Sequence, residues 1–94
     1  MNSIIQDKKE CYICGTTIGL EEHHCLLGKN RSNAEKYGLK VFLCQTHHRG
    51  TNGVHGKNGN ELQNKLKVIA EVKWLKHYNC AIEDFIEVFG RNYL

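Results

Sequence analysis

The chain has 94 residues, a length that allows one hydrophobic core but not two. A hydrophobic content of 40% and the absence of proline indicate a compact globular domain and exclude a disordered chain. The formal net charge is +3, and the basic excess falls within residues 29–58, where six basic side chains stand against one acidic side chain. Such a stretch is either a solvated basic loop or a surface that attracts phosphates.

No apolar run approaches the roughly 18–20 residues that cross a bilayer. The first residues, MNSIIQDKKE, have neither the apolar segment nor the cleavage site of a signal peptide. We therefore expect no membrane contact and a cytoplasmic location. In that reducing compartment five cysteines, an odd number, are more typical of metal binding than of disulfides.

Residues 1–10 are polar, and we expect them to form a loosely attached lead-in. They are followed by a CxxCG knuckle in which Cys11 and Cys14, separated by two residues, can bind one ion while Gly15 permits a tight turn. A thioredoxin-like redox pair is the alternative, but it requires a preceding buried strand that the sequence does not offer.

The next segment predicts two short strands with a small helix between them. Residues 16–20 are expected to form a hairpin turn, and residues 21–27 a strand. A polar helix of one or two turns over residues 30–37 should end at Gly38, in the left-handed conformation that glycine adopts at low cost. The β-prone residues 41–43 predict the second strand.

Beyond the second strand the chain is expected to be helical. A helix could start near His47, and the glycine-rich residues 49–60 should interrupt regular structure. Helical spacing predicts a long helix over residues 61–78 with an apolar face, and we expect its second half to pack on two sides. A short helix over residues 81–89 should end the fold. Together these elements predict an α+β protein in which residues 1–94 form a single domain.

Four metal ligands can be assembled from two knuckles with the same spacing. Cys44 and His47 repeat the two-residue gap of Cys11 and Cys14, and four such ligands complete a closed structural zinc site. Cys44 and His47 could instead be a buried thiol and a surface histidine. We favour the shared site because a chain of this length commonly needs a metal or disulfide to be stable.

Four further histidines, His23, His24, His48 and His55, lie within a short stretch of the chain. Adjacent residues of a strand face opposite ways, so that one of His23 and His24 can bind a metal while the other faces a substrate. An ion held by two or three side chains keeps positions open for water and phosphate. Polar surface histidines are the alternative interpretation.

This arrangement resembles the HNH endonucleases, also called ββα-metal or His-Me finger nucleases, and most closely the short HNH-like proteins of bacteriophages. The likeness rests on the CxxCG knuckle, the histidine pair and the LCQTHH segment, and covers residues 11–55. It implies a zinc-stapled ββα-metal core at residues 11–58, followed by two C-terminal helices within residues 59–94. It further implies that His23 and His48 bind a catalytic divalent ion, and that His24 is the general base.

The sequence departs from this family at two places. The asparagine that braces the base in the family is missing, since Gly38 and Leu39 occupy its position; Asn30 or Asn33 is the candidate replacement. A further ligand of the catalytic ion is expected after His48, where both Asn52 and His55 are candidates. We favour His55 because imidazole is the stronger ligand for a transition metal.

The resulting hypothesis is a metal-dependent endonuclease that hydrolyses DNA, with a structural Zn²⁺ and a catalytic Zn²⁺, Mg²⁺, Mn²⁺ or Ni²⁺. Arg31 and Arg49 suit phosphate contacts because a guanidinium group can bind two oxygens. Besides DNA, the expected partner is a second copy of the chain or a phage or host DNA-processing protein. The alternatives are a zinc-stabilised nucleic-acid-binding module without catalysis, and an accessory protein of a phage DNA-processing machine.

Overall fold

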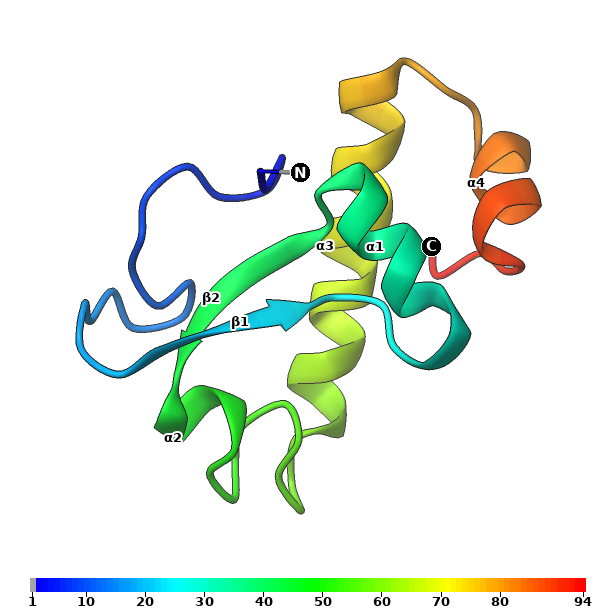
Figure 1. Ribbon diagram of the computed structural model, residues 1–94. Helices are drawn as coiled ribbons and strands as arrows, with labels where there is room; N and C mark the ends of the chain where they lie inside the picture. Colours follow the sequence, from blue (N-terminus) through cyan, green and yellow to red (C-terminus); the bar gives the residue numbers. More distant parts are fainter. Residues whose placement is uncertain (1) are drawn as a thin grey trace.

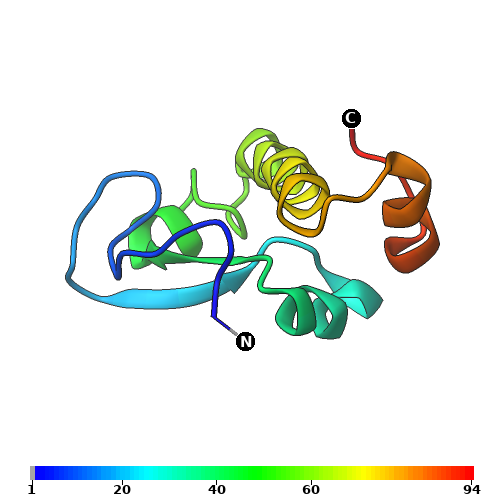
Figure 2. The ribbon, with the colours of Figure 1, turned by 90° about the horizontal axis from the view of Figure 1, so that it is seen from above.

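The computed structural model describes residues 2–94. This part of the chain contains two antiparallel strands and four α-helices, which confirms the predicted α+β class. The elements are, in order, β1 (Leu20–His24), the 3-10 turn η1 (Gly28–Asn30), α1 (Arg31–Tyr37), β2 (Lys40–Cys44), α2 (Gln45–His48), α3 (Asn60–Tyr78) and α4 (Ile82–Phe89). Helices α1 and α2 lie at opposite ends of the sheet, and α3 passes behind it (Figure 1). Seen from above, α4 lies on the far side of α3 from the knuckle segment (Figure 2).

The register of the sheet separates its side chains into two faces. His24 pairs with Lys40, and His23 pairs with Val41. Because side chains alternate along a strand, His23 and Val41 project to the same face, opposite to that of His24 and Lys40. His23 and Val41 are buried there, with relative exposures of 2% and 1%, together with Leu43. The two adjacent histidines of β1 therefore have different surroundings.

Helix α3 covers the buried face of the sheet with the apolar side chains predicted for that role. Leu66 and Ala70 belong to the same core as the inward residues of β2. The second half of α3 packs against α4 as well as the core, through Trp74, whereas Val68 and Val72 are exposed at 36% and 46% in the single chain. Trp74 is buried, as expected of a core residue.

Helix α4 is attached by aromatic packing and by two asparagines. The rings of Trp74 and Phe85 lie 5.5 Å apart between their centroids, in an edge-to-face arrangement. The side-chain amides of Asn30 and Asn33 donate hydrogen bonds to the backbone oxygens of Phe89 and Val88, at 2.8 Å and 3.3 Å. These bonds satisfy carbonyl groups that the end of a helix leaves without partners. Both asparagines hold α4, so neither braces His24.

The N-terminal segment is bound along the outer edge of β2, which corrects the expectation of a loose lead-in. The backbone amide of Ile4 donates to Gly38 O at 2.9 Å. The Gln6 side chain accepts a hydrogen bond from the backbone amide of Phe42 at 2.8 Å, and the amide of Tyr12 donates to Phe42 O at 2.9 Å. These bonds occupy an edge that would otherwise expose unpaired backbone groups.

The connection from the first knuckle to β1 is a tight turn rather than the predicted hairpin. The amide of Gly15 donates to Cys11 O at 2.8 Å, and Gly15 has a φ of 78°. Residues 16–19 then lead into β1, and no strand precedes them within the described chain. The strand itself is shorter than predicted, since it ends at His24.

Two glycines end helices as predicted. Gly38 follows α1 with a φ of 76°, and Gly90 follows α4 with a φ of 88°. Helix α2 begins at Gln45, directly after β2 and earlier than expected. Within residues 2–94, no helix has the length and apolarity required to cross a membrane.

Candidate metal centres and reactive histidine

The four residues predicted as zinc ligands come together beside helix α2. Cys11 and Cys14 arrive from the tight turn, while Cys44 ends β2 and His47 lies one turn further along the chain. The Cys14 and Cys44 sulfur atoms are 3.8 Å apart, and His47 Nδ1 lies 3.2 Å from Cys44 Sγ. His47 Nδ1 is also 3.7 Å from Cys11 Sγ. The four side chains are close enough to hold one metal ion.

The chemistry of this four-residue cluster suits zinc. A tetrahedral ion with Zn–S bonds of about 2.3 Å separates two sulfurs by about 3.8 Å, which matches the pair Cys14–Cys44. That distance is far from the roughly 2.05 Å of a disulfide, and all five cysteines are free thiols. Burial by itself would raise the pKa of Cys11, but hydrogen bonds from the backbone amides of Cys14 and Cys44 outweigh it and lower the pKa to about 6. A thiolate, the form that binds metal, is thereby favoured.

A second cluster consists of three histidines from three different segments. His23 comes from β1, His48 from α2 and His55 from the loop that follows α2. The ring of His23 lies 5.3 Å from that of His48 and 5.2 Å from that of His55, and the last two rings are 4.8 Å apart. One nitrogen of each ring lies within 4.8 Å of the others. We call these three residues the histidine trio.

The electrostatics of the trio keep its nitrogens available as metal ligands. Burial, and then the neighbouring histidines His48, His55 and His24, lower the pKa of His23 to about 3. Burial also lowers the pKa of His55, with further contributions from His48 and Arg49. His23 Nε2 is buried and has no hydrogen-bond partner among the described residues. A buried polar atom without a partner costs free energy, and a metal ion in the trio would remove that cost.

A carboxylate fixes the orientation of His48. The His48 Nδ1–H group donates to Glu21 Oε1 at 3.0 Å, which directs Nε2 toward the other two rings. Glu21 Oε2 in turn forms an ion pair of 2.7 Å with Arg49. Hydrogen bonds from His48, and then the charge of Arg49, lower the pKa of Glu21. Carboxylates commonly orient histidine ligands in metal sites.

The loop between α2 and α3 brings His55 to the trio through a series of tight turns. Every third residue of this loop is a glycine, in the series Gly50, Gly53, Gly56 and Gly59. The backbone amide of each glycine after the first donates a hydrogen bond to the carbonyl oxygen of the glycine before it. The amide of His55 also donates to His48 O at 3.0 Å. Asn52, the rival candidate ligand, instead accepts a hydrogen bond from Asn58 at 3.2 Å. The glycine-rich tract is therefore an ordered structure that presents His55.

Replacing Gly56 with alanine is expected to weaken metal binding at the trio. A Cβ atom on Gly56 would collide with the backbone oxygens of Gly50 and Thr51, so the turns must open and His55 must shift. Metal titration should show at least about tenfold weaker affinity, with the four-residue cluster still loaded. Gly19→Ala is the control for a strained glycine without a collision, because its φ of 65° disfavours alanine while a Cβ atom there meets nothing within 4 Å. Equal affinities in the two variants would contradict this role of the glycines.

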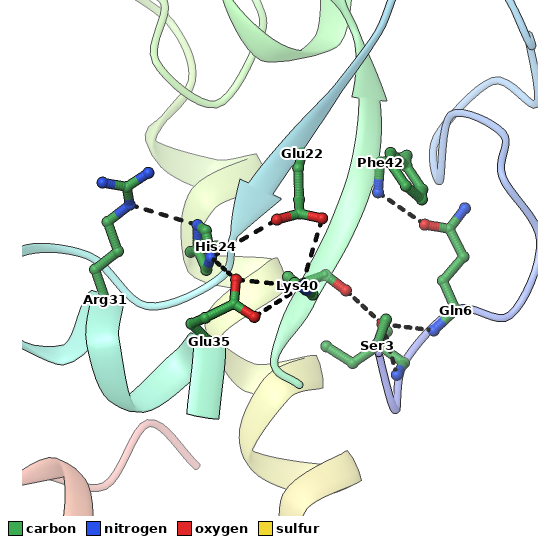
Figure 3. A network of polar contacts seen from close by, with 9 residues as sticks. Ser3, Gln6, Glu22, His24, Arg31, Glu35, Lys40 and Phe42 are labelled. Atoms are coloured by element: carbon green, nitrogen blue, oxygen red, sulfur yellow. Dashed lines mark hydrogen bonds and ion pairs between the residues drawn. The ribbon is translucent and has the colours of Figure 1, made fainter. Parts of the chain in front are cut away.

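His24 projects from the other face of β1 into a network of charged side chains (Figure 3). Its Nε2 lies 2.9 Å from Glu35 Oε1, and Arg31 Nε donates to its Nδ1 at 3.4 Å. Glu35 also accepts hydrogen bonds from Lys40 at 2.9 Å and 3.2 Å. Glu22 is more distant, with one carboxylate oxygen 4.0 Å from His24 Nε2.

The carboxylate of Glu35 stays ionised in this network. Hydrogen bonds from His24 and from Lys40 lower the pKa of Glu35 to about 2. Glu22, His24 and Glu35 are close enough to hold a metal ion. However, the ammonium group of Lys40 already lies 2.9 Å from Glu35 and 3.5 Å from Glu22, so a cation is supplied by the chain itself.

A groove of about 530 Å³ opens beside His24. It is lined by residues of β1, η1 and α1, namely His24, Gly28, Lys29, Arg31, Ser32 and Glu35. Lys29 and Arg31 give one wall a positive charge that suits a phosphate group. Arg49, the other predicted phosphate contact, has an exposed side chain and is paired with Glu21.

Most of the predicted site residues thus fall into two clusters, while two carboxylates were missed. Glu35 is the single acidic residue in the basic segment 29–58, and this isolation was a signal. Glu21 precedes His23 by two residues and therefore shares its face of β1.

Comparison with known proteins finds no matching family model, no matching curated protein and no matching solved structure.

Proposed function

We propose that the protein is a metal-dependent endonuclease that hydrolyses DNA phosphodiester bonds, with a ββα-metal core of the HNH type. The single observation that carries the proposal is the contrast between two adjacent residues of β1. His23 belongs to a buried trio of imidazoles, while His24 is hydrogen-bonded to a carboxylate and lines a groove with basic side chains. Metal-dependent phosphodiester hydrolysis requires a bound metal ion and a positioned base. Strand β1 contributes to both, since His23 belongs to the ligand set and His24 is the base.

Each cluster has a separate role in this proposal. The four-residue cluster Cys11, Cys14, Cys44 and His47 holds a structural zinc, because its ligands close the coordination shell. The trio offers only three ligands and leaves a position open. Three neutral imidazoles favour zinc, nickel or another transition metal, whereas magnesium prefers oxygen ligands. When bound, such an ion supplies electrostatic stabilisation for the charge that develops on the phosphate and on the leaving oxygen.

The chain's own residues carry the remaining steps. Arg31 and Lys29 hold the phosphate in the groove. His24 removes a proton from a water molecule, whose oxygen forms a new bond to phosphorus. The bond from phosphorus to the 3′ oxygen breaks, and that oxygen takes a proton from solvent, so the products carry a 3′ hydroxyl and a 5′ phosphate.

Replacing His24 with alanine is expected to lower the rate of nicking of supercoiled DNA by about 100-fold or more, because the general base is lost. The assay compares the wild type with His24→Ala in the presence of zinc, nickel, manganese or magnesium. His77→Ala is the control, since this histidine is exposed on α3 outside both clusters and should leave the rate unchanged.

Two outcomes would count against the proposal. Nicking that survives His24→Ala would remove the assigned base. Binding of DNA without cleavage in any of the four metals would favour the alternative of a zinc-stabilised binding module. Metal content measured on the same samples shows whether each variant is still folded around its structural ion.

A further inference from the structure

The two ring nitrogens of His24 have different partners, and this difference decides which of them can act as a base. Nε2 lies 2.9 Å from a carboxylate oxygen of Glu35, a distance typical of a charge-assisted hydrogen bond. An ionised carboxylate can only accept, so the shared proton belongs to Nε2. Nδ1 faces the guanidinium group of Arg31, which can only donate, so Nδ1 presents its lone pair.

We infer that Glu35 is the positioning residue of the general base, and that it holds His24 in the tautomer whose Nδ1 atom accepts the proton from water. This inference rests on the proposed function and assigns to a glutamate of α1 the bracing task for which the sequence suggested Asn30 or Asn33, both of which bind α4 instead. Glu35 touches neither water nor phosphate in this scheme, because it acts through the imidazole.

The structure distinguishes Glu35 from the other carboxylate near His24. Glu22 Oε1 is 4.0 Å from Nε2, beyond the length of a hydrogen bond, whereas Glu35 Oε1 is at 2.9 Å. Lys40, opposite His24 in the sheet, donates to both oxygens of Glu35. Side chains from β1 and β2 therefore meet this carboxylate of α1, which hydrogen-bonds to both of them, whereas Glu22 makes no hydrogen bond to His24.

Arg31 connects this arrangement to the substrate. Its side chain is exposed and lines the same groove as His24, so the guanidinium group can leave Nδ1 and bind a phosphate oxygen. A phosphate bound to Arg31 in this groove is close to the Nδ1 lone pair of His24, because both side chains line the groove. In this scheme a water molecule takes the place of the guanidinium group, now 3.4 Å from Nδ1, when substrate binds.

The tautomer of His24 can be measured without any cleavage assay. We propose ¹⁵N NMR of histidine-labelled protein at about pH 8, where a free imidazole is neutral. The wild type is expected to show His24 protonated at Nε2. Glu35→Ala should give a mixture of the two tautomers, and Glu22→Ala, the matched control, should retain the wild-type signal. A wild-type His24 protonated at Nδ1, or an unchanged signal in Glu35→Ala, would overturn the inference.

Steady-state nicking gives the second readout. Glu35→Ala is expected to lower kcat by about 10- to 100-fold with little change in KM, since the ground-state contacts to phosphate remain. Glu22→Ala should retain at least half of the wild-type kcat. If His24→Ala abolishes nicking and Glu35→Ala leaves kcat unchanged, the inference fails while the proposed function stands. If His24→Ala nicks normally, the proposed function fails, and the NMR signals still decide whether Glu35 sets the tautomer.

Discussion

Replacing Cys44 with serine is expected to abolish zinc binding by the four-residue cluster and to unfold the protein. Structural zinc sites contribute about 10–16 kcal/mol of binding free energy in small zinc-finger peptides, which exceeds the stability of most domains of this length. A serine hydroxyl does not ionise as a thiol does, so one of four bonds is lost. The cluster also joins the tight turn at Cys11 to the end of β2, and both would be released.

The measurement is zinc content by elemental analysis, combined with thermal unfolding followed by circular dichroism. Cys80→Ser is the matched control, because Cys80 lies outside both clusters and its Sγ–H donates to the Tyr78 backbone oxygen, a bond that a hydroxyl can replace. A Cys44→Ser protein that retains stoichiometric zinc and melts at the wild-type temperature would show that the four-residue site is not structural.

Replacing His48 with alanine is expected to abolish cleavage and leave the fold intact. His47 and His48 are adjacent in α2, yet His47 belongs to the four-residue cluster and His48 to the trio. The substitution should therefore remove the ion of the trio and retain the structural zinc. We expect a fall in cleavage rate of at least about 1,000-fold, which corresponds to roughly 4 kcal/mol of transition-state stabilisation.

Metal titration of the zinc-loaded protein tests this expectation directly. The wild type should bind an additional nickel or zinc ion, and His48→Ala should not, while both proteins melt at similar temperatures. His77→Ala again serves as the control for loss of an imidazole. A His48→Ala variant that binds the additional ion with wild-type affinity would exclude the trio as the catalytic centre.

The two clusters were predictable because short-range spacing limits where their side chains can go. Two residues between Cys11 and Cys14 allow both sulfurs to reach one ion from a single tight turn. Strand alternation by itself places His23 and His24 on opposite faces of the sheet. The choice of His55 over Asn52 was made from ligand chemistry alone, and the loop indeed places His55 in the trio.

The partners of the supporting residues were harder to predict than the residues themselves, since those contacts join distant segments. Glu35 meets His24 only because α1 folds back beside the end of β1, and no local pattern specifies that geometry. The N-terminal segment binds the edge of β2 through backbone groups and the Gln6 side chain, and neither type of contact has a sequence signature. Val68 has helical apolar spacing in α3, but spacing alone does not tell whether a second partner covers that face.

The glycines of the loop after α2 should tolerate substitution as poorly as the histidines in a mutational scan of this protein. Gly53, Gly56 and Gly59 offer no functional group, yet a Cβ atom at each would collide with backbone of an earlier turn. A scan scored by cleavage would rank these glycines beside the histidines, and intolerance alone would suggest a catalytic motif. The same library scored by metal retention would separate the residues by role. The glycines would then group with His55, because both are needed to hold the ion, and His24 would not.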